Sequence, residues 1–313
     1  MKAWTATDAK HGAAHPIELA DVAEPVPASN QAVVEVTAFS VNRGEFLGLT
    51  GAYGPGRTAG TVPGQDVAGR VVVAAADGSG PQAGERVVAH PDGGGWAERV
   101  AVATDLLTTL PDHVSDEIAA SLPLAGITAI RLLRKAGDVT GRRVLVTGAS
   151  GGVGHLLVEL LVAAGAAVTA VAATADRGQR LAAFGAEFVT EIARDGEPFE
   201  LILESVGGAT FAAALARLAP GGTVIWFGQA GLEPISLDFF ELIGSTPLAL
   251  HHFPHWVSDR SDATDLAELV SAVAAGTLHP ELGRVTDWAE TPTALADLAA
   301  RRIRGNAVLT VRR

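Results

Sequence analysis

The stretch that decides the fold is residues 142–161, which read RRVLVTGASGGVGHLLVELL. An apolar, β-branched run ends at Thr147, and small residues fill the turn before an amphipathic run that starts near Val153. A turn from a strand into a helix needs residues without bulky side chains where the backbone takes positive φ or approaches a ligand. The pattern therefore predicts a strand, a glycine turn and a helix in succession.

This glycine turn is typical of a dinucleotide site. The N-terminus of the predicted helix presents unpaired N–H groups and the positive end of the helix dipole, which suit a pyrophosphate. The spacing is Ala149-x-Gly151-x-x-Gly154, so alanine takes the place of the first glycine of the usual G-x-G-x-x-G string. A second apolar strand, residues 168–172, follows the helix. This βαβ order favours a bound dinucleotide over a glycine turn without a ligand.

The end of the second predicted strand indicates which dinucleotide binds. NAD sites usually carry Asp or Glu about 20 residues past the glycines, whereas this strand ends in Ala-Ala-Thr-Ala at residues 172–175. Arg177 and Arg180 follow, and a guanidinium can bind a 2′-phosphate with parallel hydrogen bonds. The sequence favours NADPH, and the alternative is that both arginines are ordinary solvated charges at the start of a helix.

Composition restricts the class of protein. The chain has 313 residues, 48% of them hydrophobic, which is enough for two domains. It has no cysteine, which excludes disulfides, thiolate zinc sites and a cysteine nucleophile. The formal net charge is −12 and the sequence has no basic run, so we expect no binding to nucleic acid.

No segment has the pattern of a targeting signal or a membrane span. The first ten residues, MKAWTATDAK, lack an apolar signal core and an Arg- and Ser-rich transit pattern. The apolar stretch 156–173 is interrupted by Glu159 and divided at Gly165 into a helix and a strand, each too short to span a bilayer. We expect a cytoplasmic protein that does not bind membranes.

The sequence pattern changes along the chain in a way that predicts two domains. Up to about Leu110, short alternating runs bounded by Gly, Pro and Asp indicate strands at 32–37, 69–73, 85–88 and 96–100. From Asp116, strands and helices alternate as in an α/β domain, with strands at 199–203 and 223–227 and a helix over 210–218. After Pro254, a helix over 263–275 and strands at 284–286 and 307–311 suggest a return to the first domain.

Several motifs together resemble the medium-chain dehydrogenase/reductase superfamily, and within it the zinc-independent quinone oxidoreductase-like and enoyl reductase branch. Besides the glycine turn, the motifs are SVNRGE at 40–45, PGQDVAG at 63–69, LAGITA at 124–129, ESVGG at 204–208, and GGTVIWFG at 221–228. The resemblance covers nearly the whole chain. It implies an α/β protein with a GroES-like β-rich catalytic domain (1–117), a doubly wound Rossmann NADPH-binding domain (118–254) and a return to the catalytic domain (255–313).

The resemblance also implies a cofactor site made of many residues. The nicotinamide half would contact Asn42 and Thr128, and its ribose and ring would contact Val206, Phe227 and Gly228. The rest of the cofactor would take its pyrophosphate contacts from Ser150, Gly151, Gly152 and Val153, and its adenosine phosphate contacts from Thr174 and Arg177. Asn306 stands where the family often has lysine, and it would donate a hydrogen bond to the cofactor. For Asn42 and Thr128 the alternative is local capping of a turn or helix.

Zinc-containing relatives carry Cys and His ligands at the positions of Asn42 and Gln65 in this chain. The cysteine-rich lobe that holds a structural zinc in those relatives is also missing. The resemblance therefore implies that no metal is bound.

Reduction of an activated C=C bond leaves an enolate, which needs a proton. Tyr53, the only tyrosine, resembles in position the residue proposed to protonate the enolate in the enoyl reductase branch, and a packing or substrate-wall role is the alternative. His251 and His252 follow a predicted strand at 248–250, near where relatives line the substrate cleft. They would bind a carbonyl or assist proton delivery, whereas His155 on the predicted phosphate helix is expected to be a surface or capping group.

Taken together, the sequence predicts an NADPH-dependent oxidoreductase that reduces a quinone or the C=C bond of an α,β-unsaturated carbonyl by direct hydride transfer without a metal. The alternative within enzymes is a dedicated enoyl-thioester or polyketide-pathway enoyl reductase. The alternative of another class is a non-catalytic NADPH-binding redox sensor or structural protein. Members of the branch commonly pair through edge strands, and the apolar stretch 247–250 would be a liability as an open edge, so we expect a homodimer.

Overall fold

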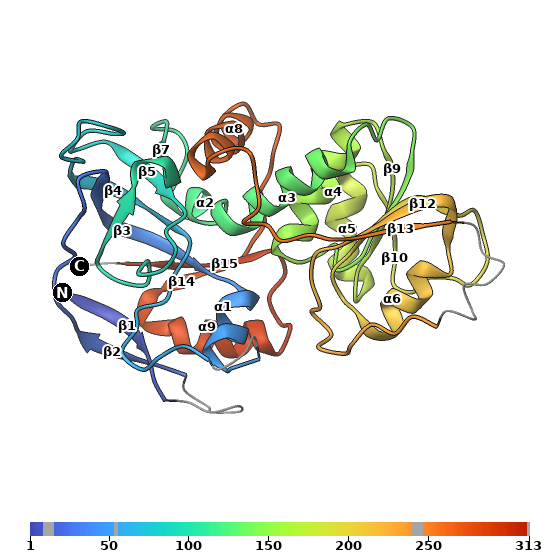
Figure 1. The fold of residues 1–313 in the computed structure, drawn as a ribbon, viewed down its shortest axis with the longest axis horizontal. Helices are drawn as coiled ribbons and strands as arrows, with labels where there is room; N and C mark the ends of the chain where they lie inside the picture. Colours follow the sequence, from blue (N-terminus) through green and yellow to red (C-terminus); the bar gives the residue numbers. More distant parts are fainter. Residues whose placement is uncertain (9–15, 53–55, 239–246, 312–313) are drawn as a thin grey trace. The chain divides into compact units, whose positions relative to one another are not determined.

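The computed structural model describes residues 1–8, 16–52, 56–238 and 247–311 (Figure 1). The chain forms two compact units, one of residues 1–127 with 259–313 and one of residues 128–258. The first boundary falls within helix α3 (Pro123–Ala136). The sequence-based division has its boundaries after residues 117 and 254, close to these positions.

The first unit is built on mainly antiparallel strands. In the described part of the chain its larger sheet has the order β14-β15-β3-β4-β5-β7, with β6 paired to β3. The strands are β3 (Gln31–Val41), β4 (Val67–Val73), β5 (Arg86–Ala89), β6 (Arg99–Ala103), β7 (Leu107–Thr109), β14 (Leu282–Asp287) and β15 (Asn306–Thr310). A separate antiparallel pair is formed by β1 (Lys2–Ala6) and β2 (Ile17–Asp21). The helices are α1 (Arg43–Leu49), α2 (Asp116–Ala120), α8 (Asp262–Ala274) and α9 (Thr291–Ala299), with 3₁₀ turns η1 (Thr104–Leu106) and η2 (Trp288–Glu290).

The last strand of the chain joins the first unit through β3. In this antiparallel pair Ala307 lies opposite Val41, and Leu309 packs in the same buried cluster as Phe39. The GroES-like β-rich domain expected from the sequence is therefore present, and residues near the two ends of the chain share its core.

The expected strand at residues 96–100 is wrong in its first half, because β6 begins only at Arg99. Trp96 instead occupies an irregular segment in the core. Its side chain is fully buried, its indole Nε1 donates to the carbonyl of Ser40 over 3.0 Å, and its ring stacks on Phe39. Gly64 must stay small here, since a Cβ at that position would lie 2.4 Å from the Trp96 nitrogen.

The second unit holds a parallel sheet. Its strand order is β10-β9-β8-β11-β12-β13 in the described residues, which is the doubly wound arrangement expected from the sequence. The strands are β8 (Arg143–Val146), β9 (Ala167–Val171), β10 (Glu187–Val189), β11 (Phe199–Glu204), β12 (Leu218–Trp226) and β13 (Ala249–His252). The helices between them are α4 (Gly152–Ala163), α5 (Ala175–Ala183) and α6 (Gly208–Leu215). Because the winding direction reverses between β8 and β11, their carboxyl ends mark the position where such sheets bind ligands.

Helices cover both faces of this sheet (Figure 1). On one face Phe211 of α6 packs against Ile202 and Val224 of the central strands, all fully buried or nearly so. The opposite face lies against α3, whose Lys135 and Ala136 approach side chains of β11 and β12. Burial on both sides explains why these strands are apolar without strict alternation.

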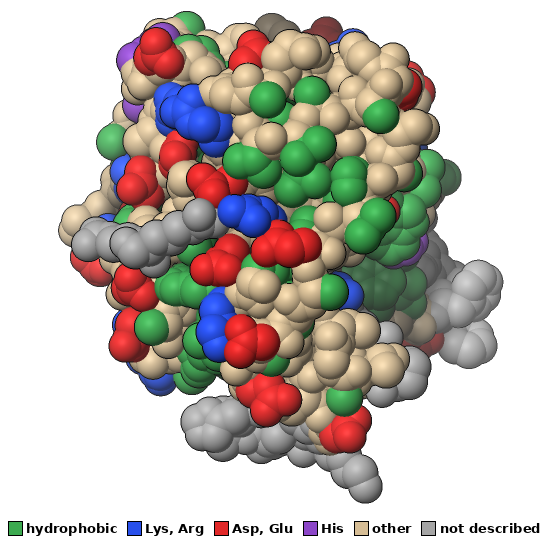
Figure 2. Space-filling view, turned by 90° about the vertical axis from the view of Figure 1, so that its left-hand side faces the viewer, with side chains coloured by type: hydrophobic (Ala, Val, Ile, Leu, Met, Phe, Trp, Pro, Cys, Tyr) green, Lys and Arg blue, Asp and Glu red, His purple; other side chains and the backbone are tan. Residues whose placement is uncertain are grey.

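None of the helices in the described ranges is long and apolar enough to cross a membrane. Figure 2 shows one face of the molecule, on which basic and acidic side chains alternate with small hydrophobic areas. That face has no continuous basic surface that would attract a polyanion.

Candidate functional site

The glycine turn lies at the carboxyl end of β8, where the sequence predicts it. Gly148 has a φ of 61°, and a Cβ there would lie 2.6 Å from the Ser205 hydroxyl. A Cβ at Gly154 would lie only 2.4 Å from the carbonyl oxygen of Gly148. Gly151 is the N-cap of α4 and has no side chain to cap it. The turn therefore brings the start of α4 close to the strand and offers its first N–H groups to an anionic ligand.

The expected contacts for the adenosine phosphate come together beside this turn. Thr174 is the N-cap of α5, and its hydroxyl accepts from the Arg177 N–H over 3.4 Å. The Arg177 Nε donates to the Ser150 hydroxyl over 3.2 Å. Arg180, by contrast, lies over the ring of Phe184, 5.5 Å from its centroid. Arg177 is thus the arginine that reaches the glycine turn.

The residues expected at the nicotinamide ribose follow the next two strands at the same edge of the sheet. Val206 comes after β11, and Phe227 and Gly228 come after β12. The Phe227 N–H donates to the Glu204 carbonyl over 2.9 Å, and a Cβ at Gly228 would lie 3.1 Å from the Cβ of Ser205. These loops pack backbone against backbone, and they contact the glycine turn through Ser205.

A buried hydrogen-bonded network that the sequence analysis missed lies beneath these loops. Glu204 and Thr147 are both 0% exposed. The Glu204 Oε1 accepts from the Thr147 hydroxyl (3.1 Å) and from the backbone N–H groups of Val206 (2.8 Å) and Gly207 (3.0 Å). Burial raises the pKa of the Glu204 carboxyl above its ordinary value. A charged residue at the end of an apolar strand was the available signal, since Glu204 opens the quoted ESVGG motif.

In the first unit Asn42 is held by a cluster of polar side chains. It is the N-cap of α1, and its Nδ2 donates to Asp66 Oδ2 over 2.6 Å and to the Ser40 hydroxyl over 3.2 Å. Glu45 accepts from the Asn42 N–H over 2.8 Å and from the Gln65 N–H over 2.9 Å. Asn42 therefore caps α1 through a capping box with Glu45, and its contact with the cofactor stays a prediction.

Two carboxyl groups lie buried in this cluster. Glu45 is 2% exposed and Asp66 is 0% exposed. Burial, and next the nearby charge of Asp66, raise the pKa of Glu45 to about 8, although the N–H groups of Asn42 and Gln65 oppose this shift. The raised pKa favours the protonated form of Glu45.

The donors at this position do not fit a zinc ion. The Asn42 amide nitrogen is engaged with Asp66, and the chain has no cysteine. In the part of the chain that the structure describes, no three His, Asp or Glu side chains are grouped to hold a metal. A catalytic zinc needs three protein ligands in such a group.

The structure brings Asn306 to the Asn42 position from the other end of the chain. Ala307 pairs with Val41 at the end of the antiparallel register, and Asn306 and Asn42 are the next residues beyond this pair. Asn306 is 5% exposed, and within the described residues its Nδ2 has no hydrogen-bond partner. A buried amide donor without a partner suits the hydrogen bond to a ligand that the sequence suggests.

The remaining expected site residues are Tyr53, Thr128, His251 and His252. Tyr53 lies outside the described residues. Thr128 lies within α3 and is 6% exposed. His251 and His252 do not follow the last strand as expected, because both belong to β13 and pair with Ile225 and Trp226.

The two histidines of β13 point to opposite faces of the sheet, because side chains alternate along a strand. His252 makes an edge contact with the ring of Trp226, with centroids 6.0 Å apart. His251 lines a cavity of about 150 Å³ with Lys135 and Thr223. They are therefore not neighbouring side chains of one substrate cleft.

His155 is not a surface group. It is 0% exposed on α4, and its Nδ1 lies 2.9 Å from the carbonyl oxygen of Gly151. Burial lowers the pKa of His155 to about 4, so the neutral ring donates its Nδ1 proton to that carbonyl. The buried His155 side chain thus holds the carbonyl of Gly151 in the glycine turn.

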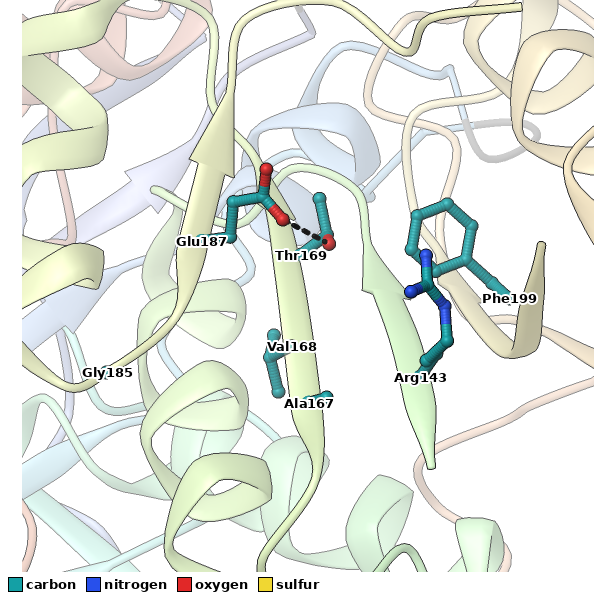
Figure 3. Close-up of a pocket in the computed structure, with 7 residues that line it drawn as sticks. All are labelled: Arg143, Ala167, Val168, Thr169, Gly185, Glu187 and Phe199. Atoms are coloured by element: carbon teal, nitrogen blue, oxygen red, sulfur yellow. Dashed lines mark hydrogen bonds between the residues drawn. The ribbon is translucent and has the colours of Figure 1, made fainter. Parts of the chain in front are cut away.

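A second cavity, larger than the one at His251, is shown in Figure 3. It has a volume of about 210 Å³ and is lined by Arg143, Ala167, Phe199 and neighbouring residues. These three are the first residues of β8, β9 and β11, so the cavity lies at the amino edge of the sheet. Arg143 lies over the Phe199 ring at 5.6 Å, and the nearby hydroxyl of Thr169 donates to a Glu187 oxygen over 3.4 Å.

Comparison with known protein families gives two matches. Residues 28–112 match the alcohol dehydrogenase GroES-like domain, and residues 185–309 match a family described as zinc-binding dehydrogenase. A chloroplast envelope quinone oxidoreductase homolog of Arabidopsis thaliana is 35% identical over 235 residues, which are 68% of this chain and 71% of that protein. The chain belongs to the quinone oxidoreductase-like branch of the medium-chain dehydrogenase/reductase superfamily. This confirms the family expected from the motifs.

Two further relatives of this quinone oxidoreductase-like protein bear on its chemistry. An acryloyl-coenzyme A reductase of Metallosphaera sedula is 27% identical over 320 residues, which are 90% of this chain and 93% of that protein. A mycobacterial protein solved in complex with NADPH is 27% identical, with a TM-score of 0.89, and the match covers 99% of this chain and 100% of that one. The family uses NAD(P)H, and the fold matches over the full length.

Proposed function

We propose that this protein is an NADPH-dependent oxidoreductase that transfers hydride to a quinone or to the C=C bond of an α,β-unsaturated carbonyl. The observation that carries the choice of NADPH is the hydrogen bond from Arg177 Nε to Ser150 Oγ, which sets a fixed positive charge beside the glycine turn. A guanidinium at this position binds a 2′-phosphate, and no carboxylate ends β9 to bind ribose hydroxyls.

Each loop at the carboxyl edge of the sheet has a separate task in this proposal. The N–H groups from Gly151 to Val153 bind the pyrophosphate, and Thr174 with Arg177 binds the adenosine phosphate. Val206, Phe227 and Gly228 orient the nicotinamide ribose and ring. The cofactor supplies the hydride when it is bound, and the protein's contribution is to hold donor and acceptor carbon in line.

Residues of the first unit act on the cofactor and the substrate. Asn42 contacts the nicotinamide half of the cofactor, and Asn306 offers its buried amide nitrogen as a hydrogen-bond donor. Tyr53 donates its phenolic proton to the enolate that hydride transfer leaves behind. Because His251 and His252 point to opposite faces of β13, at most one of them assists this proton transfer.

The test of this function is the oxidation of NADPH, and separately of NADH, across a panel of quinones, enones and enoyl thioesters. We expect NADPH to be preferred and at least one quinone or enone to be turned over. Binding of NADPH without oxidation by any acceptor would contradict the enzyme and support a non-catalytic redox sensor or structural protein.

A dedicated enoyl-thioester reductase is the second candidate. The near full-length similarity to an acryloyl-coenzyme A reductase favours it. This candidate predicts that, in the same panel, kcat/KM for coenzyme A or carrier-protein thioesters exceeds kcat/KM for free enones and quinones by at least about tenfold. A tenfold ratio corresponds to about 1.4 kcal/mol in activation free energy.

We also propose that the reaction needs no metal, because the donors around Asn42 do not fit zinc. Activity is expected to survive exhaustive chelation, and purified protein is expected to contain no stoichiometric zinc. One tightly bound zinc per chain that is required for turnover would contradict this part of the proposal.

A further inference from the structure

The carboxyl group of Glu204 links two loops of the second unit. Its Oε1 accepts one hydrogen bond from Thr147, which follows β8 just before the glycine turn, and two from the backbone of Val206 and Gly207, which follow β11. The pyrophosphate and the nicotinamide ribose are assigned to these two loops in the proposed function. One oxygen atom thus connects the loops for the two halves of the cofactor.

Ser205 closes the same link from the other side. Its N–H donates to the Thr147 hydroxyl over 2.9 Å, and its own hydroxyl donates to the Thr147 carbonyl over 3.1 Å. The Thr147 hydroxyl therefore donates to Glu204 and accepts from Ser205. These bonds form a closed ring, which fixes the spacing of β8 and β11 where their strands end.

Packing alone does not account for a carboxyl group at this position. Glu204 is 0% exposed, and its second oxygen, Oε2, is buried without a hydrogen-bond partner in the described residues. Burial of such a group is unfavourable, and an apolar side chain of similar volume would fill the space at a lower cost. The benefit of the carboxyl group must therefore lie in the three donors that its other oxygen holds.

We propose that Glu204 is a positioning residue that sets the nicotinamide-ribose loop at a fixed distance from the phosphate turn. This inference rests on the proposed function. Glu204 acts through loops that hold the parts common to NADPH and NADH. Its loss should therefore weaken both cofactors by the same factor, whereas a residue that binds the 2′-phosphate affects NADPH alone.

The experiment compares Glu204→Leu with Glu204→Gln and measures the dissociation constants of NADPH and NADH by titration of the purified protein. We expect Glu204→Leu to raise both constants about tenfold or more, since it removes the acceptor of three hydrogen bonds. It should also lower kcat at saturating NADPH, because the ring is held less firmly. Glu204→Gln should restore most of both, since its amide oxygen accepts the same three bonds.

Glu200→Gln is the matched control. Glu200 is an exposed carboxylate on the same strand, at the amino end, where it accepts from the Arg143 N–H. We expect this variant to bind both cofactors as the wild type does. Urea unfolding of every variant identifies the conditions under which that variant is folded. The dissociation constants are measured under those conditions.

Unchanged cofactor affinities and kcat in a folded Glu204→Leu variant, with only a lower unfolding midpoint, would overturn the inference. If this variant does not fold, Thr147→Val against Thr147→Ser tests the same link, because only serine keeps the hydroxyl. Equal behaviour of these two would likewise overturn it. Failure of the wild type to bind either cofactor would instead contradict the proposed function, and this inference with it.

Discussion

The two units of this protein use a buried glutamate in similar ways, with different results. Glu45 in the first unit accepts backbone N–H groups from Asn42 and Gln65, and Glu204 in the second accepts them from Val206 and Gly207. Each carboxyl group joins segments that are near the proposed site. The common device is a buried acceptor that orders loop backbone where no regular secondary structure does.

The difference lies in what each unit presents to a ligand. In the first unit the Asn42 side chain donates to a buried carboxylate, Asp66. The orientation of the Asn42 amide therefore depends on the surrounding polar side chains. In the second unit the glycine turn presents backbone N–H groups, and no side chain stands between them and a phosphate. Changes around Asn42 in the first unit should therefore alter the chemistry, and changes at the phosphate-binding end of the second should alter cofactor affinity.

The largest expected effect belongs to the first unit. Tyr53→Phe is expected to lower turnover of an enone by about a hundredfold or more, the scale of a positioned general acid, and to leave the dissociation constant of NADPH unchanged. Quinones should lose less, because their reduced form takes protons from water. The measurement is the ratio of enone to quinone turnover in the wild type and the variant.

An unchanged ratio would show that Tyr53 is only a wall of the cleft. A weaker affinity for NADPH would show that it packs against the cofactor, and the contrast between the two units would then fail at this residue.

A smaller effect, confined to affinity, is expected in the second unit. Arg177→Ala removes charge-assisted hydrogen bonds worth about 1.5 to 3 kcal/mol, or roughly tenfold to a hundredfold in the dissociation constant of NADPH. NADH binding should barely change. Arg143→Ala is the matched control, since Arg143 packs on Phe199 at the amino edge of the sheet, away from the glycine turn. Equal losses for both cofactors, or none for either, would refute the assignment of Arg177.

The raised pKa of Glu45 predicts a pH dependence of stability. Since its pKa is raised to about 8 in the folded protein, the folded state binds more protons than the unfolded state above the ordinary pKa of 4.5. Its contribution therefore makes the free energy of unfolding fall as pH rises from about 4.5 to 8. Glu45→Gln cannot titrate and should flatten this part of the profile. Urea midpoints between these pH values measure it, and parallel profiles for variant and wild type would contradict the assignment.

The smallest expected effect concerns assembly through the second unit. We propose a homodimer that pairs through β13, the edge strand of the described sheet. Leu250 packs against the buried cluster around Phe211, so Leu248→Lys is the cleaner change. It should shift the mass seen by light scattering toward the monomer without lowering the unfolding midpoint. A monomeric wild type at micromolar concentration would argue against the dimer.

The sequence by itself determined the second unit's architecture and one half of its proposed site. Its signals are local: the glycine turn lies between a strand and a helix, and Arg177 lies three residues past the N-cap Thr174. Residues this close in sequence take positions dictated by the turn and the helix alone. The family motifs extended the prediction over the whole chain, and the matched families confirm it.

Only the tertiary structure decided which distant residues meet. The pairing of Ala307 with Val41 brings Asn306 to the end of β3 that leads into Asn42, and Glu204 reaches Thr147 because β8 and β11 are neighbours in the sheet. Pairing with β12 extends β13 to His252, so His251 and His252 point to opposite faces of the sheet. Strand order and register arise from contacts between segments far apart in the chain, which periodicity within one segment does not encode.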